Sequence, residues 1–261
     1  ELKQSDSTTP ANRIRELQPT RGCNEQFTTT TADEIRAIGD FFLEFIIPRD
    51  LSEVLLPIAR AQLFSIVQYD IAVSKVCLSC SDVRAMDFGE AVAGAMTNDA
   101  KYGFQTYCSS DKYGFEATHS ALVFQPVNAT TGEKVEGVLR GFVSGHSTET
   151  DVSSGPSDLW PDSISGILDS DPDVLDDLAK VLILRNFLTS SVAASAGTVA
   201  ILPDYTGYGA SRDFDRTYLA PMPYQQSFAV SYMAAKRYVS DTSDGCTQLE
   251  DVATVAGYSE G

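Results

Sequence analysis

The sequence predicts an α/β fold, with a mostly parallel sheet flanked by helices and a helical segment at the N-terminus. Two observations lead to this prediction. From about residue 115 onward, strand-like and helix-like segments alternate, which is the pattern of βαβ units. One strand-like segment, TVAIL at 198–202, is short and almost wholly apolar, as expected for a parallel strand covered on both faces.

The composition of the chain limits the kinds of partner that it can bind. The chain has 261 residues, 43% of them hydrophobic, and a formal net charge of -17. So acidic a chain is poorly suited to nucleic acid, because phosphate binding needs clustered Lys and Arg. No uninterrupted apolar run approaches the roughly 18 residues of a membrane span. We therefore expect no nucleic-acid partner, no transmembrane segment, and neither a cofactor nor a bound metal.

The five cysteines indicate disulfide bonds. They are Cys23, Cys77, Cys80, Cys108 and Cys246. The CxxC pattern of Cys77 and Cys80 is compatible with a redox pair or half of a zinc site, but no second CxxC and no nearby histidine completes a metal site. Disulfides in a secreted protein are the favoured interpretation, with one cysteine left over. A glycosylation sequon at Asn128 agrees with secretion and predicts an N-glycan.

The first 114 residues divide into two segments. Residues 1–31 are rich in Thr, Ser, Gln and Arg and predict an extended or poorly ordered lead-in, and residues 32–114 predict a helical and then mixed segment. Thr31 and Glu34 form a capping-box pattern, which predicts the start of a helix. Apolar residues then recur at helical spacing to about Val67.

Two prolines, Pro48 and Pro57, are expected to interrupt this helical region. Its first part has a dense apolar group: Phe41, Phe42, Phe45, Ile46 and Ile47. We expect this group to pack in the core, since aromatic residues at helical spacing are usually buried. The alternative is a lid or a lipid-facing surface.

Two strand-like segments open the region after residue 115. They are ATHSALVFQP at 117–126 and VEGVLRGFVSG at 135–145, and the turn-forming segment VNATTGEK separates them. This arrangement predicts a hairpin or two neighbouring antiparallel strands.

The acidic stretch that follows predicts a helix start and not a calcium site. Three aspartates alternate in it: Asp169, Asp171 and Asp173. An EF-hand loop would need Gly and Glu where Val174 and Lys180 stand. Asp171 and Pro172 instead provide an N-cap and a first-turn proline for a helix that ends near Gly197.

The last third of the chain continues the alternation. TVAIL is followed by the turn-rich segment PDYTGYGAS, by helical spacing through 223–239, and by VATVAG at 252–257 as a second buried strand. We expect the two strands to be adjacent or nearly adjacent, with the helix at 224–239 crossing between them.

The pentapeptide GYSEG, residues 257–261, directly follows VATVA. A G-x-S-x-G pattern at the end of a strand is typical of a nucleophile elbow, a tight strand-to-helix turn that exposes the serine hydroxyl. Glycines allow such a turn to close without side-chain clashes. The position of GYSEG after a βαβαβ run favours a catalytic serine at Ser259.

GYSEG and ILPDYTGYGAS resemble motifs of the α/β-hydrolases, and more narrowly of the secretory lipases related to Candida antarctica lipase A. The resemblance covers residues 115–261, which it implies are the N-terminal part of an α/β-hydrolase domain that ends here at the nucleophile elbow. It further implies a secreted serine hydrolase for carboxylic esters, with a lipid or small ester as substrate and no cofactor.

The same resemblance assigns roles to single residues. Ser259 would be the nucleophile, and the backbone N–H of Glu260 would donate one hydrogen bond to the oxyanion. The second donor would come from the loop after the third strand, where three residues are candidates: His146, Ser147 and Thr148. Asp204 and Tyr205, in the PDY segment, are expected to hold a turn and not to take part in chemistry.

A serine hydroxyl needs a base. Both histidines of the chain, His119 and His146, precede Ser259, whereas the hydrolase order is serine, acid, histidine. We therefore expect the acid and the histidine after residue 261, and expect the chain as written to be an incomplete and inactive piece. His146 is expected to have a structural role in its loop, with a catalytic role as the alternative. His119 alternates with apolar residues and is expected to occupy a plain strand position. An inactive binding module, a peptidase and an acyltransferase are alternative functions for the same fold.

Overall fold

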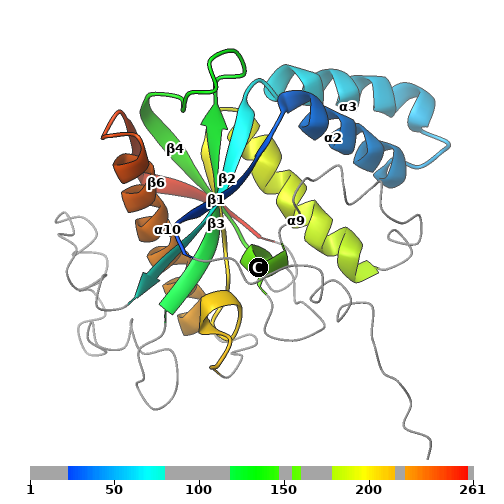
Figure 1. Ribbon diagram of the computed structural model, residues 1–261. Helices are drawn as coiled ribbons and strands as arrows, with labels where there is room; N and C mark the ends of the chain where they lie inside the picture. Colours follow the sequence, from blue (N-terminus) through cyan, green and yellow to red (C-terminus); the bar gives the residue numbers. More distant parts are fainter. Residues whose placement is uncertain (1–22, 80–117, 147–154, 160–177, 215–220, 258–261) are drawn as a thin grey trace, which may run out of the picture.

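The computed structural model describes residues 23–79, 118–146, 155–159, 178–214 and 221–257, which form a six-stranded sheet with helices on both faces (Figure 1). The strands are β1 (Glu25–Thr30), β2 (Asp70–Ser79), β3 (Thr118–Val127), β4 (Gly137–Ser144), β5 (Val199–Pro203) and β6 (Thr247–Ala256). The helices are α2 (Ala32–Ile46), α3 (Ser52–Ile66), α7 (Pro156–Leu159), α9 (Leu178–Ser195) and α10 (Pro221–Thr242), with a 3-10 turn, η3, at Gly209–Ser211.

The sheet has the strand order β1-β2-β3-β5-β4-β6. The pairs on the β1 side are antiparallel, whereas β4 is parallel to both β5 and β6. The predicted α/β class is confirmed, and the sheet is mixed. Because β1 and β2 join the strands that follow residue 115, one sheet includes strands from both sides of that position.

The predicted pairing of the two strands after residue 115 is wrong. Those strands are β3 and β4, and β5 lies between them, antiparallel to β3 and parallel to β4. All five residues of β5 are buried. Such a strand has helices packed on both of its faces and a neighbouring strand paired with each of its edges. The turn at Asn128 does form, with an isolated antiparallel bridge between Val127 and Lys134, but beyond it the apolar strand β5 separates β3 from β4.

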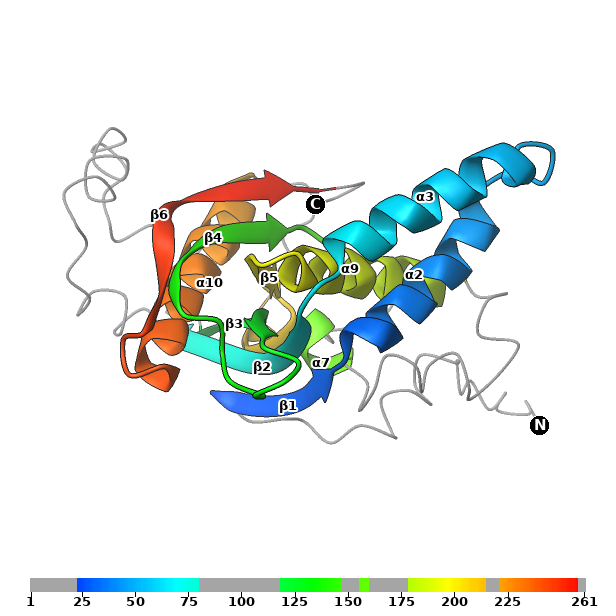
Figure 2. The ribbon, with the colours of Figure 1, turned by 90° about the horizontal axis from the view of Figure 1, so that it is seen from above.

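Helices cover both faces of the sheet, with α2 and α9 on one face and α10 on the other (Figure 2). One core cluster joins α2 and α9 to the sheet, and the other joins α10 to the opposite face. As predicted, α9 ends before Gly197, which has a left-handed φ of 94°. As predicted too, α10 links the two apolar strands, β5 and β6, which flank β4.

The N-terminal helices only partly follow the expectation. Thr31 and Glu34 form the predicted capping box at the start of α2. The chain leaves the helix near Pro48 as expected, but Pro57 lies within α3 and does not interrupt it. Pro57 lies beyond the first turn of this solvent-exposed helix, so it removes one helical hydrogen bond without ending the helix.

The apolar group of the first helix divides between core and surface. Phe42 is buried beside Ile35 and Ile38, and Phe41 packs against the same cluster. Ile46, by contrast, is 63% exposed, so the prediction that the whole group lies in the core is wrong. The structure does not describe the side chain of Phe45. Ile46 is the last residue of α2, and this end of the helix extends beyond the sheet (Figure 2).

VATVA, predicted to be a buried strand, is largely exposed in this chain. It forms the last part of β6, the strand at one edge of the sheet, and its Val252 and Val255 are 73% and 64% exposed. At an edge, only one side of the strand has a hydrogen-bonded neighbour, and the helix packed nearest, α10, covers only part of the strand.

One disulfide connects two of the five cysteines in the described part of the chain. A disulfide joins Cys23 to Cys77 and so connects the residues before β1 to β2, which excludes a redox or zinc role for the pair Cys77 and Cys80. Cys246 is an exposed free thiol, and Cys80 and Cys108 lie outside the described residues, as does the acidic stretch Asp169–Asp173. Among the helices that the structure describes, none is long and apolar enough to cross a membrane.

Candidate functional site

The candidate site lies where β4 and β6 end. These two strands are parallel, so their carboxyl ends meet at one edge of the sheet, which is where ligands bind in α/β folds. The N–H of Gly145 donates to the carbonyl of Ala256 over 2.8 Å. His146 therefore directly follows Gly145, which is hydrogen-bonded to β6, the strand that leads into GYSEG. Ser147, Thr148, Ser259 and Glu260 lie outside the described residues.

His146 is fully buried, and two tyrosines from the turn after β5 enclose its ring. The ring of Tyr205 is stacked on it with centroids 3.9 Å apart, and the ring of Tyr208 meets it edge-on at 5.5 Å. The Tyr205 hydroxyl also donates to the His146 carbonyl over 3.2 Å. Both the side chain and the backbone of His146 are therefore held by the same tyrosine.

Tyr205 in turn contacts α10. Its ring centroid lies 4.6 Å from that of Tyr224 and 6.1 Å from that of Phe228. We call these five residues the aromatic cluster: His146, Tyr205, Tyr208, Tyr224 and Phe228. The cluster connects the loop after β4, the turn after β5 and the helix that leads to β6.

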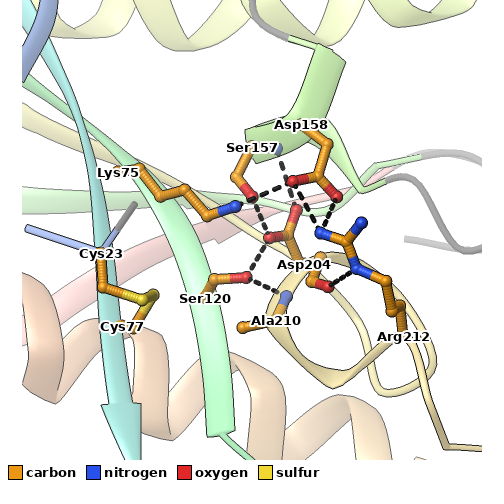
Figure 3. Close-up of a disulfide and its surroundings, with 10 residues drawn as sticks. Cys23, Lys75, Cys77, Ser120, Ser157, Asp158, Asp204, Ala210 and Arg212 are labelled. Atoms are coloured by element: carbon orange, nitrogen blue, oxygen red, sulfur yellow. Dashed lines mark hydrogen bonds and ion pairs between the residues drawn. A yellow bond between two sulfur atoms is a disulfide. The ribbon is translucent and has the colours of Figure 1, made fainter. Parts of the chain in front are cut away.

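Asp204, the residue before Tyr205, is the centre of a buried polar network (Figure 3). Its carboxylate accepts hydrogen bonds from the hydroxyls of Ser120 and Ser157, and from the Ser157 N–H over 3.0 Å. Its own N–H donates to the Ser120 carbonyl over 2.9 Å. Burial, and then the charge of Asp158, raise the pKa of Asp204 to about 6, while Lys75 acts in the opposite direction.

The network holds the turn after β5 in place, as expected for Asp204. The Ser120 hydroxyl accepts a hydrogen bond from the N–H of Ala210 over 2.9 Å. Gly209 has a φ of 55°, and a Cβ at this position would collide with the Asp204 carboxylate and the Ser120 hydroxyl. The second glycine of the TGYGA segment, Gly209, is therefore required both by its backbone conformation and by the close approach of the network.

Two basic side chains complete the network. The Lys75 ammonium lies 2.8 Å from a carboxylate oxygen of Asp158, and the Arg212 guanidinium lies 3.2 Å from the other (Figure 3). Lys75 and Asp158 are almost fully buried. Neither residue was predicted to belong to the site. The one signal in the sequence is the lysine inside the apolar segment IAVSKVCL, because a lysine is costly to bury unless its charge is paired.

His119 is a buried residue of β3, which confirms the expected strand position. Neither ring nitrogen has a hydrogen-bond partner among the described residues, and burial lowers the pKa of His119 to about 4. The unfolded chain, with a histidine pKa near 6.5, therefore binds more protons than the folded protein between about pH 6.5 and pH 4. The free energy of unfolding is therefore highest above pH 6.5, where the ring is neutral in both states, and it falls as the pH decreases toward 4.

We expect the substitution His119→Leu to remove this acid sensitivity. Relative to the variant, the wild-type free energy of unfolding should fall by up to about 3 kcal/mol between pH 7.5 and pH 4, since one pKa unit corresponds to 1.36 kcal/mol. Urea unfolding of both proteins at four pH values measures the difference. Parallel stability curves would contradict the prediction.

The comparisons with known proteins found a distant similarity to solved structures of an esterase. No protein-family model and no curated protein matches the chain. The crystal structure of a rice cell wall degrading esterase LipA from Xanthomonas oryzae matches with 17% identity and a TM-score of 0.47. A ligand-bound form of that esterase matches with 17% identity and a TM-score of 0.46. Each match covers 91% of this chain and 41% of the esterase.

This chain therefore spans less than half the length of the solved structures that it matches. At this identity and TM-score, the matches support no argument about its activity. The narrower likeness to lipases related to Candida antarctica lipase A stays a prediction based on GYSEG and ILPDYTGYGAS.

Proposed function

We propose that the full-length product of this gene is a serine hydrolase that cleaves carboxylic esters through an acyl-enzyme. The observation that supports the proposal most is the hydrogen bond from the Gly145 N–H to the Ala256 carbonyl. It joins the loop that begins at residue 145 to the strand end that precedes GYSEG. These are the two segments from which a hydrolase with a nucleophile elbow builds its oxyanion site.

In the proposed reaction, the Ser259 hydroxyl attacks the ester carbonyl while a base takes its proton. The negative charge on the carbonyl oxygen is stabilised by the backbone N–H of Glu260 and by a donor at His146, Ser147 or Thr148. The base returns the proton to the leaving alcohol, and water then hydrolyses the acyl-enzyme. The acid and the histidine are expected after residue 261.

The burial of His146 supports a structural role for its ring. A general base must reach the proton that it removes, and the His146 ring is buried between Tyr205 and Tyr208. We therefore propose that the loop after β4 contributes through its backbone, and that the base is a different histidine.

Several features support secretion of this hydrolase. The disulfide between Cys23 and Cys77 is typical of proteins from oxidising compartments. Asn128 is exposed in the turn after β3, and its side-chain oxygen accepts hydrogen bonds from the N–H groups of Thr130 and Thr131. We propose an N-glycan at Asn128. The sheet itself crosses the predicted segment boundaries at residues 31 and 115, because β1 pairs with β2 and β2 pairs with β3.

A fluorophosphonate probe tests the proposed function, because it reacts with an activated serine and not with an ordinary one. We expect the folded full-length protein to bind one equivalent of probe, at Ser259 as mapped by peptide mass spectrometry. Heat-unfolded protein is the control and should not react. Absence of labelling on the folded protein would favour the inactive binding module.

The choice of substrate separates the remaining alternatives. A serine esterase should hydrolyse p-nitrophenyl butyrate and leave the matching anilide intact, whereas a peptidase should cleave both. Transfer of the butyryl group to an added alcohol in preference to water would identify an acyltransferase.

A further inference from the structure

We propose that Tyr205 is a positioning residue of this esterase: its hydroxyl fixes the His146 carbonyl and, through it, the loop that completes the oxyanion site. This inference rests on the proposed function. The inference adds to the proposed function by naming Tyr205, which lies outside the loop, as the residue on which the position of the second oxyanion donor depends.

Tyr205 contacts both the ring and the backbone of His146. Tyr205 is 1% exposed and His146 is fully buried. Their rings are stacked with an interplanar angle of 21°, and the hydroxyl at the far end of Tyr205 reaches back to the His146 carbonyl. A buried hydroxyl needs a partner, and a buried carbonyl does too, so this bond satisfies both groups.

The carbonyl bond has a consequence beyond His146. A peptide group is planar, so the direction of a carbonyl also fixes the plane of the N–H that follows it. A hydrogen bond to the His146 carbonyl therefore orients the peptide group that leads into the loop of the candidate oxyanion donors. Orientation matters there, because an oxyanion donor contributes to the rate only when it is already aligned with the developing charge.

Tyr205 can fix another residue because it is itself fixed from several directions. The preceding residue, Asp204, is hydrogen-bonded to β3 and to α7. The carbonyl of Tyr205 accepts the N–H of Tyr208 over 2.9 Å. Its ring rests against Tyr224 and Phe228 of α10. The buried polar network thus holds the backbone of Tyr205, and the aromatic cluster holds its ring.

The substitution Tyr205→Phe in the full-length protein tests the proposal, since it removes the hydroxyl and keeps the ring. We expect kcat for p-nitrophenyl butyrate to fall about 10-fold or more, with KM within about twofold of wild type, because loss of a transition-state interaction lowers kcat. Inhibition by a trifluoromethyl ketone, which forms a tetrahedral adduct with the serine, should weaken by the same factor as kcat/KM.

A matched control is available at Tyr238, whose hydroxyl donates to the Ser74 hydroxyl over 2.9 Å. Tyr238→Phe also removes one hydrogen bond, but on β2 and α10, away from the aromatic cluster, so its kcat should equal that of wild type. Equal losses in both variants would show a general effect of stability and overturn the proposal.

The remaining outcomes are equally decisive. A Tyr205→Phe protein with wild-type kcat overturns the positioning role, and so does one that no longer folds, because the hydroxyl would then be structural. Wild-type protein that neither hydrolyses the ester nor binds the fluorophosphonate overturns the proposed function instead. The two failures are therefore distinguished by the wild-type measurements.

Discussion

Replacing Ser259 by alanine in the full-length protein is expected to abolish ester hydrolysis while leaving the fold intact. Nucleophile, base and acid act as one unit, so loss of the nucleophile alone should lower kcat by about 10⁴- to 10⁶-fold. A residual rate above that of water is expected from the oxyanion donors and from substrate binding. Hydrolysis of p-nitrophenyl butyrate by Ser259→Ala, normalised to protein that unfolds cooperatively, measures the effect.

A serine far from the candidate site provides the control. Ser65 is exposed on α3 and donates to the Gln62 carbonyl over 2.8 Å. Ser65→Ala should retain wild-type turnover and should still bind the fluorophosphonate. If Ser259→Ala also retains wild-type turnover, Ser259 is not the nucleophile, and the interpretation of GYSEG as an elbow is wrong.

The sequence was sufficient to predict elements whose signals are local. The capping box at Thr31, the buried strand β5 and the helix α10 each depend on residues that are neighbours in the chain. The place of the loop after β4 beside GYSEG was implied by the resemblance to α/β-hydrolases, and in the structure Gly145 is hydrogen-bonded to Ala256 at the end of β6. These features define the fold class and the edge of the sheet at which the candidate site lies.

What could not be predicted depends on partners far apart in the chain. The turn after β3 suggested a hairpin, but strand pairing is decided by which strand can be covered on both faces, and β5 takes the central position. The exposure of VATVA in this chain has a related origin, because the apolar pattern of a strand does not show how many neighbouring strands it has in the sheet.

The buried polar network shows the same limit at the candidate site. Asp204 was recognised as part of a turn, but its partners Ser120 and Ser157 are 84 and 47 residues away. Lys75 and Asp158 are 83 residues apart. A single sequence shows only that a lysine interrupts an apolar strand, and not which carboxylate compensates its charge.

The substitution Lys75→Met should have the largest effect on stability. Methionine has a similar length and no charge, so the change mainly removes the ammonium that lies 2.8 Å from Asp158. Removing one partner of a buried ion pair leaves the other charge uncompensated, which costs about 3–5 kcal/mol. Urea unfolding at pH 7.5 should therefore show a midpoint far below that of wild type.

The pH dependence of this loss distinguishes the network from ordinary packing. Asp204 has a folded pKa of about 6, above its value in the unfolded chain, so the folded protein binds more protons between about pH 4 and pH 6. The contribution of Asp204 to stability therefore declines as the pH rises through this window. Because Lys75 lowers the pKa of Asp204, its removal should extend the decline to higher pH, and Lys75→Met should lose more stability at pH 8 than at pH 5.

An exposed ion pair provides the comparison. Lys236 and Asp251 also form a salt bridge, but their side chains are 43% and 71% exposed, so water already screens the two charges. Lys236→Met should change the urea midpoint little at either pH. A small and pH-independent effect of Lys75→Met would mean that Arg212 alone compensates Asp158, and that the lysine is not needed to bury the two carboxylates. A large loss that grows with pH would instead establish Lys75 as the charge that allows Asp158 and Asp204 to be buried together, beneath the turn from which Tyr205 reaches His146.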